Sequence, residues 1–235
     1  MSVLCKWEEL PEEMQVEEVR KYYDYLKTKT LSLVIKRLFD IIVSLLMIIV
    51  LIPVFLLIAL LIKLDSKGPA IFKQVRVTSY GREFKMLKFR SMVVDADKGS
   101  SQLTTGADSR ITRVGAKLRN NRLDELPQLF NILTGDMSFV GARPEVPRYV
   151  DQYTPEMRAT LLLPAGVTSE ASILFRDEYM LLEGKSDVGK AYVEGVLPEK
   201  MKYNLDSLKH FSFWSDIRTI FRTVFVVIGV DIKPV

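Results

Sequence analysis

The sequence has almost none of the nitrogen and sulfur side chains that bind transition metals. Cys5 is the only cysteine and His210 the only histidine among 235 residues. One cysteine excludes an intramolecular disulfide and a cysteine-based metal site, and one histidine excludes a multi-histidine zinc site. A Ser-His-Asp triad would have to use His210, which we interpret instead as a surface or helix-packing residue. The lack of disulfides favours a reducing compartment.

The usual nucleotide-binding loops are also absent. The chain contains no G-x-x-x-x-G-K-[ST] and no G-x-G-x-x-G, the two glycine-rich patterns that cradle phosphates at a helix start. Internal repeats and low-complexity tracts are absent as well. Any phosphate chemistry in this chain therefore needs a different binding arrangement.

Basic residues are concentrated in the middle of the chain. Residues 63–122 carry fourteen basic and five acidic side chains, a local net charge of +9, whereas residues 1–30 carry five basic and seven acidic ones. Such a block predicts an anionic partner, either nucleic acid, lipid headgroups or a phosphate-rich small molecule. Nucleic acid is disfavoured because no aromatic stacking platform or nucleic-acid-binding motif accompanies the block.

One long apolar run, residues 41–62, contains only Ser44 and Pro53 outside the apolar set. As a helix rising about 1.5 Å per residue, it is long enough to cross a hydrocarbon core of about 30 Å. Pro53 predicts a kink near its middle. Basic residues flank both ends, so charge gives no orientation. The residues leave two arrangements open: a tilted span, or a bent helix that enters and leaves one leaflet.

Local patterns predict a mostly helical chain with one β-hairpin. Amphipathic helices are expected over residues 8–30, 111–121, 123–133 and 211–230, a hairpin over residues 70–77 and 83–89, and a loop over residues 95–110. Gly135 is expected to end the third helix. The last helix places Trp214 and Phe221 opposite arginines, which suits either a membrane interface or core packing.

Two adjacent acids, Asp124 and Glu125, stand at the expected start of the helix over residues 123–133. Pro127 confines them to the first turn or just before it. The helix dipole, Arg119 and Arg122 are expected to keep them ionised. An ionised Asp is a competent nucleophile or Mg²⁺ ligand, and the same helix end attracts phosphate. The simpler interpretation is a helix-capping pair.

The segment that follows strengthens the phosphate interpretation. In GDMSFVGARPE, residues 135–145, two glycines permit tight backbone, and Arg143 followed by Pro144 is a fixed, forked phosphate binder.

The chain resembles the bacterial sugar transferase family, the monotopic phosphoglycosyl transferases. The matching segments, which cover about residues 33–225, are KRLFDIIVS, the apolar run with Pro53, GPAIFKQVRV, FKMLKFRSM, LDELPQLFNILTGDMSFVGARPE, GVTSEASILFRDE and NLDSLKHFSFWSDIRTIF. Several ordered motifs at the family spacing make the resemblance specific.

The resemblance implies a two-step mechanism on a UDP-sugar. Asp124 is similar to the family nucleophile: it would displace UMP, and undecaprenyl phosphate would then take the phosphosugar from it. Glu125 matches the partner acid, and both acids would hold Mg²⁺ as cofactor. The resemblance also implies substrate or phosphate binding by Lys88, Arg90, Arg119, Arg143, Pro144 and Asp216. Residues 166–178 are expected to influence the choice of sugar.

The resemblance further implies the architecture. The fold class expected is mostly helical α+β, with a re-entrant helix kinked at Pro53, interfacial amphipathic helices and a small hairpin around a compact cytosolic catalytic domain. We divide the chain into an N-terminal extension (1–32), the membrane-embedded helix (33–63) and the catalytic domain (64–235). The enzyme would sit at the cytoplasmic face of the bacterial inner membrane, in contact with membrane lipid, and would start glycoconjugate assembly. A homo-oligomer and downstream glycosyltransferases are further expected partners.

Two alternatives carry different expectations. A non-catalytic membrane-anchored basic module explains the apolar run and the basic block but not the acid pair beside Arg143. Such a module would keep working with Asp124→Asn. A membrane phosphatase would use the same acyl-phosphate chemistry with water as acceptor, and would release free phosphate.

Overall fold

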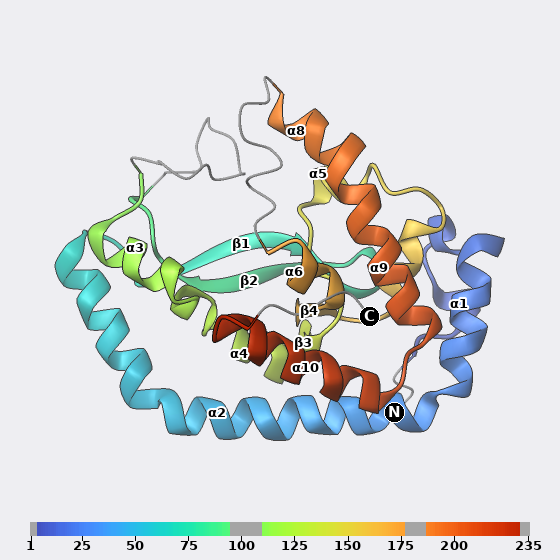
Figure 1. Cartoon of the computed structure of the whole chain (residues 1–235), viewed down its shortest axis with the longest axis horizontal. Coiled ribbons are helices and arrows are strands. Elements are labelled where there is room, and N and C mark those ends of the chain that lie inside the picture. Colours follow the sequence, from blue (N-terminus) through green and yellow to red (C-terminus); the bar gives the residue numbers. More distant parts are fainter. Residues whose placement is uncertain (1–3, 95–109, 177–186, 231–235) are drawn as a thin grey trace.

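A computed structural model describes residues 4–94, 110–176 and 187–230. Within them the chain is mostly helical and carries two small two-stranded sheets (Figure 1). The predicted α+β class with a hairpin is therefore confirmed. The second sheet is an addition that the sequence patterns did not indicate. The predicted loop over residues 95–110 lies almost wholly outside the described residues.

The N-terminal segment folds as two short 3₁₀ turns, Trp7–Glu9 and Glu12–Met14, and helix α1, Glu17–Thr28. The expected single helix over residues 8–30 is thus wrong before Glu17, where Pro11 precedes a 3₁₀ turn instead. The apolar face of α1 is buried and shares one hydrophobic cluster with α5 (Pro147–Val150) and α9 (Leu197–Lys209). The proposed boundary at residue 32 stays a prediction.

Helix α2, Thr30–Asp65, forms one edge of the molecule. Figure 1 shows that it bends partway along, and Pro53 is the proline inside it, so the predicted kink is confirmed. One face is buried at intervals of mostly three or four residues, at Leu33, Lys36, Asp40, Ser44, Ile48, Ile58 and Ile62. Apolar side chains on the outer face are exposed from Leu31 to Leu64. Among the described residues, α2 is the helix long and apolar enough to cross a membrane.

The hairpin pairs β1, Ile71–Val77, with β2, Glu83–Phe89, in an antiparallel register that sets Phe72 opposite Lys88. The second sheet pairs β3, Met137–Val140, with β4, Ala165–Thr168, in parallel. The chain beyond β3 passes very close to β4: a Cβ at Gly166 would lie 2.1 Å from the Gly141 nitrogen. Only glycines allow that approach.

Helix α3, Arg113–Asn120, and helix α4, Gln128–Thr134, lie between the two sheets in sequence. Gly135 ends α4 with φ +92°, as predicted. The sequence spacing predicts a buried stripe on this helix at Leu126, Leu129, Phe130 and Leu133, and that prediction is partly wrong. Leu129 is buried, but it shares its face with Ile132, while Phe130 is 40% exposed.

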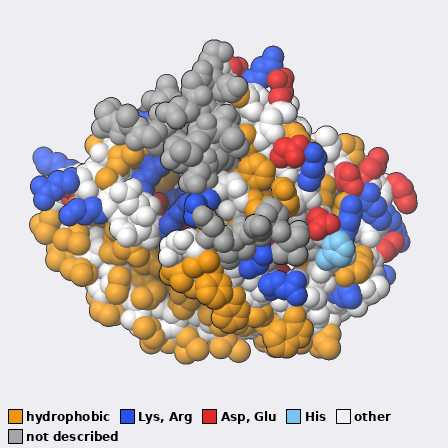
Figure 2. Space-filling model, viewed as in Figure 1, with side chains coloured by type: hydrophobic (Ala, Val, Ile, Leu, Met, Phe, Trp, Pro, Cys, Tyr) orange, Lys and Arg blue, Asp and Glu red, His pale blue; other side chains and the backbone are white. Residues whose placement is uncertain are grey.

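The C-terminal half adds α6, Glu170–Leu174, α8, Val188–Ala191, and α10, Phe213–Val227. The apolar face of α10 is exposed, with Trp214 at 76% and Phe221 at 61%. Core packing is therefore the wrong interpretation of that face. Figure 2 shows hydrophobic side chains gathered along the edge that α2 and α10 share in Figure 1.

Candidate active site

The acid pair lies in a 3₁₀ turn, Leu123–Glu125, between α3 and α4. Pro127 is the residue before the first residue of α4, so the acids precede that helix, within the predicted limits. Arg122 adopts φ +57°, a left-handed conformation that non-glycine residues rarely take. It lies between the end of α3 and the acid turn. Backbone strain of this kind is typical of functional sites.

Glu125 is held by two cations from distant parts of the chain. Lys88 Nζ on β2 lies 3.2 Å from Glu125 Oε1, and Arg143, beyond β3, donates a hydrogen bond to the same oxygen. Burial alone would raise the pKa of Glu125, but Arg143 and Lys88 together bring that pKa well below its usual value. Burial lowers the pKa of Lys88, and Glu125 opposes that change. The direction agrees with the expected ionisation of Glu125, but the cations responsible are Lys88 and Arg143 rather than the expected Arg119 and Arg122.

Asp124 behaves in the opposite way. Burial raises the pKa of Asp124, and the negative charge of Glu125 raises it further, although Lys88 and Arg119 oppose both. The expectation that the helix end and nearby arginines hold this pKa down is therefore wrong in direction. The main reason is burial, and the second is that Glu125 pairs with Lys88 and Arg143, which leaves Asp124 beside an ionised neighbour.

Asn131 on α4 fixes the position of the acid pair relative to β2. Its side-chain amide donates to the Lys85 carbonyl at 3.0 Å, and its side-chain oxygen accepts from the Leu87 N–H at 2.9 Å. This double clamp sets the register of α4 against the strand that carries Lys88. Sequence reasoning missed Asn131, although a buried asparagine on an apolar helix face is a recognisable signal.

Arg90, predicted to bind phosphate, is not brought to the acid pair. Its guanidinium is buried and caps the end of α2, donating to the Ser66 carbonyl at 2.7 Å and the Lys67 carbonyl at 2.9 Å. A helix end has unpaired carbonyls, and arginine satisfies them. Pro144 is also buried, and its carbonyl accepts from Arg76 at 3.2 Å. The contacts of Arg90 and Pro144 therefore stabilise the backbone around the site.

Asp216 is likewise held in an ion pair. Its carboxylate lies 2.5 Å from Lys36 Nζ, which also donates to the Val140 carbonyl at 2.7 Å. Burial raises the pKa of Asp216, and Lys36 opposes this. The residue after Lys36, Arg37, donates to the carbonyls of Ile132 and Leu133 at the end of α4. The polar residues at the start of α2 thus hold α4, β3 and α10.

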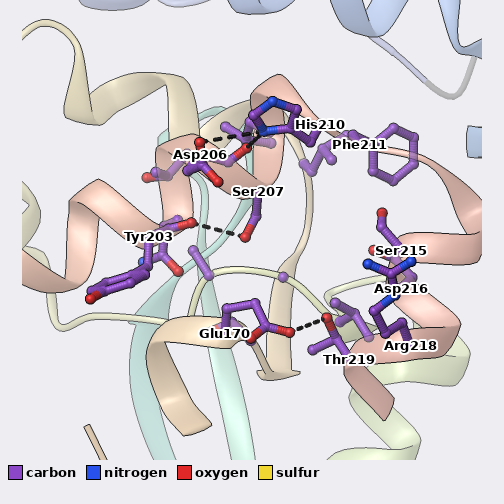
Figure 3. Close-up of a pocket in the computed structure, with 18 of the residues that line it drawn as sticks. Glu170, Tyr203, Asp206, Ser207, His210, Phe211, Ser215, Asp216, Arg218 and Thr219 are labelled. Carbon is purple, nitrogen blue, oxygen red and sulfur yellow. Dashed lines mark hydrogen bonds and ion pairs between the residues drawn. The ribbon is translucent and has the colours of Figure 1, made fainter. Parts of the chain in front are cut away.

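A cavity of about 180 Å³ lies between α6, α9, α10 and the end of β3. Lys36 and Asp216 line it, and so does Ala142, the neighbour of Arg143. Figure 3 shows Glu170, Tyr203, Asp206 and Ser207 around it, with Glu170 bonded to Thr219. The acid pair does not line this cavity. Ser169 and Glu170 belong to the segment expected to influence sugar choice, which remains a prediction.

The described residues contain no group of three or more His, Cys, Asp or Glu side chains arranged for a metal ion. Mg²⁺ is commonly held by one or two carboxylates together with substrate phosphates and water. Asp124 and Glu125 can supply the one or two carboxylates that such a site needs. Asp124 is the better candidate ligand, because Glu125 already pairs with Lys88 and Arg143. Magnesium binding stays a prediction.

Comparison with known proteins gives a consistent result. The family model for "Bacterial sugar transferase" matches residues 31–230. The UDP-glucose:undecaprenyl-phosphate glucose-1-phosphate transferase of Klebsiella pneumoniae is 39% identical over 199 residues, which are 83% of this chain and 40% of that protein. Its counterpart in Caulobacter vibrioides is 36% identical over 192 residues, 80% of this chain and 68% of that protein.

A third relative has a different donor in its name. The UDP-N-acetylgalactosamine-undecaprenyl-phosphate N-acetylgalactosaminephosphotransferase of Aeromonas hydrophila is 35% identical over 193 residues, 81% of this chain and 43% of that protein. The chain thus spans about two fifths of the length of the Klebsiella and Aeromonas relatives.

Proposed function

This chain belongs to the bacterial sugar transferase family, and on that premise we propose that it transfers a sugar-1-phosphate from a UDP-sugar to undecaprenyl phosphate. The relatives named above carry this reaction in their names. The observation that carries the proposal here is the acid pair, in which Glu125 binds Lys88 and Arg143 while Asp124 stays beside them. Three separate segments converge there, which a simple helix cap does not require.

In the proposed first step, an Asp124 carboxylate oxygen attacks the sugar-bearing phosphorus of the donor. The bond from that phosphorus to the bridging oxygen of the diphosphate breaks, and UMP leaves. In the second step an oxygen of undecaprenyl phosphate attacks the same phosphorus, forms the diphosphate and releases the Asp124 carboxylate. The raised pKa of Asp124 suits this role, because a more basic carboxylate is a stronger nucleophile once ionised.

The basic residues supply charge where the phosphates would lie. Lys88, Arg119 and Arg143 surround the acid pair, and preorganised cations stabilise the charge that develops during phosphoryl transfer. Glu125 keeps Lys88 and Arg143 in place before the donor arrives. A Mg²⁺ ion held by Asp124, Glu125 and the diphosphate would neutralise further charge.

The docking of α2 supports a re-entrant rather than a spanning arrangement. Lys36 and Asp40, before the bend, contact β3 and the residues around it, and Ile58 and Ile62, after the bend, pack with Phe89. A spanning helix needs about 20 consecutive residues in the hydrocarbon core, whereas α2 is buried against the protein on both sides of the bend, at Ile48 and again at Ile58 and Ile62. We propose that its exposed apolar face lies in the cytoplasmic leaflet and that α10 joins it there.

The test is UMP release by the protein in detergent with Mg²⁺, undecaprenyl phosphate and a panel of UDP-sugars. We expect UMP from at least one donor, and loss of it in Asp124→Asn. Asp136→Asn is the matched control, since Asp136 also lies in an ion pair, with Arg82, away from the acid pair. Lipid-independent release of inorganic phosphate would instead favour the phosphatase, and equal turnover in Asp124→Asn would refute the nucleophile assignment.

The membrane arrangement has its own test. With epitope tags on both termini, intact cells should protect both tags from added protease, and inverted vesicles should expose both. An N-terminal tag that is cleaved in intact cells would show a full span.

A further inference from the structure

A second buried charged cluster lies behind Arg143, and the proposed chemistry does not use it. Glu145, Tyr192 and Lys200 are 8%, 1% and 5% exposed. The Tyr192 hydroxyl donates to Glu145 Oε1 at 2.5 Å, Lys200 Nζ donates to the Tyr192 hydroxyl at 3.1 Å, and Lys200 Nζ lies 3.6 Å from Glu145. Burying an ion pair is costly, and an apolar replacement is often no less stable. Such a cluster is better suited to fixing geometry than to adding stability.

The cluster holds the short segment that carries Arg143. The Glu145 carbonyl accepts from the Val77 N–H at 2.9 Å, at the end of β1, and the Pro144 carbonyl accepts from Arg76. The Glu145 side chain then ties the same segment to the C-terminal helices through Tyr192 and Lys200. Arg143 precedes this anchor by two residues and reaches the acid pair.

An irregular helix brings Tyr192 and Lys200 together. Residues Tyr192–Val196 form a π-helical turn that leads into α9. In a regular α-helix, residues eight apart are rotated by about 80° from one another. A π turn takes up one extra residue, so this pair approaches the spacing of seven residues and points to nearly the same face. Such turns are frequent at functional sites.

We propose that Glu145, Tyr192 and Lys200 form a positioning network that fixes Arg143 on Glu125 and thereby orders the acid pair. The three residues do not contact substrate. They act through Arg143, whose hydrogen bond to Glu125 needs a fixed backbone. This inference rests on the proposed function for its kinetic consequences but not for its structural ones.

The decisive variant is Tyr192→Phe, which removes one hydroxyl and keeps the ring. Tyr22→Phe is the matched control, because Tyr22 is also buried and its hydroxyl donates to a carboxylate, Glu156, at 2.7 Å. We expect Tyr192→Phe to lower kcat for UMP release about tenfold, the effect of one hydrogen bond to a charged group, with little change in KM. Tyr22→Phe should retain wild-type turnover.

The split between kcat and KM separates positioning from a loss of folded protein. A looser Arg143 weakens its contact with Glu125, so kcat per folded molecule should fall in Tyr192→Phe only. In Glu145→Gln, which keeps an acceptor for Tyr192, kcat should fall between the values of Tyr192→Phe and wild type. A turnover loss equal in both tyrosine variants would overturn the proposal.

A measurement independent of turnover completes the test. Amide hydrogen exchange at Val77, whose N–H bonds the Glu145 carbonyl, should be at least about threefold faster in Tyr192→Phe than in Tyr22→Phe. If no UDP-sugar yields UMP with the wild-type protein, the proposed function fails, and this exchange result alone decides the network. Equal exchange in the two variants refutes the network while leaving the transferase assignment intact.

Discussion

The ion pair between Lys36 and Asp216 gives a direct measure of how firmly α2 is fixed to the rest of the protein. The two side chains are only 8% and 13% exposed, at 2.5 Å. Removing one partner of a buried pair leaves an uncompensated charge and costs about 3–5 kcal/mol. In Asp216→Asn the Lys36 ammonium keeps its hydrogen bond to the Val140 carbonyl. We therefore expect a loss of unfolding free energy at the lower end of this range, about 3 kcal/mol. For a chain of this size that lowers Tm by about 6–12 °C.

The reverse change has a pH signature. In Lys36→Met the pKa of Asp216, already raised by burial, rises further because its cation is gone. An acid whose folded pKa lies above its unfolded pKa loses stability as pH rises through that window, because the folded state binds the extra proton. Lys36→Met should therefore be less destabilised at acidic than at neutral pH. The double variant Lys36→Met/Asp216→Leu should recover part of the loss, because neither member of the pair stays buried without its partner, while buried Asp40 still loses the charge of Lys36.

Thermal unfolding in one detergent or nanodisc preparation measures all three variants. Glu194→Gln is the control, because its pair with Lys190 is about two thirds exposed on both sides and should change Tm little. If Asp216→Asn unfolded within about 1 kcal/mol of wild type yet lost UMP release, the ion pair would not be its main role. Asp216 would then have to act on the substrate, as the sequence resemblance implied.

Three further outcomes are expected. Arg90→Met should lower Tm while leaving the KM for the UDP-sugar unchanged, because the guanidinium caps α2; a raised KM at unchanged Tm would return Arg90 to the phosphate site. Asp124→Asn should not lower Tm at neutral pH, because the raised pKa of Asp124 means that the ionised acid destabilises the fold there; a clear drop in Tm would contradict the direction of that pKa shift. The turnover of the wild-type protein should fall as pH drops through the raised pKa of Asp124. Trp214→Ser with Phe221→Ser should weaken flotation with liposomes and keep Tm, because both side chains are exposed; unchanged flotation would remove α10 from the membrane contact.

The sequence predicted elements whose signals are local. The hairpin, α3 and the Gly135 stop follow from alternation, helical periodicity and the left-handed preference of glycine. The parallel pair β3 and β4 was missed because each strand has four residues and the partners lie far apart in sequence. No local pattern reports such a pairing.

The candidate site shows the same division. The acid pair and its convergence with Lys88 and Arg143 were predicted, the latter through the family resemblance. The individual tasks of the basic residues depend on tertiary contacts that charge alone does not reveal. Arg90 and Lys88 are two residues apart on and just after one strand, yet one caps a helix and the other binds Glu125. The shift of the Asp124 pKa likewise depends on which cations its neighbour takes.

The polar residues at the start of α2 connect membrane attachment to the site. Lys36 binds the β3 carbonyl of Val140, Arg37 binds the last carbonyls of α4, and Asp40 accepts from the Phe139 N–H. The turn that carries the acid pair leads into α4, and Arg143 follows β3. The acid pair and Arg143 therefore both lie next to elements that bind the start of α2. If α2 lies in the leaflet as proposed, a change in its tilt would pull α4 and β3 with it. The distance between Glu125 and Arg143 should therefore depend on how α2 lies in lipid, and turnover should respond to bilayer thickness even with soluble donor in excess.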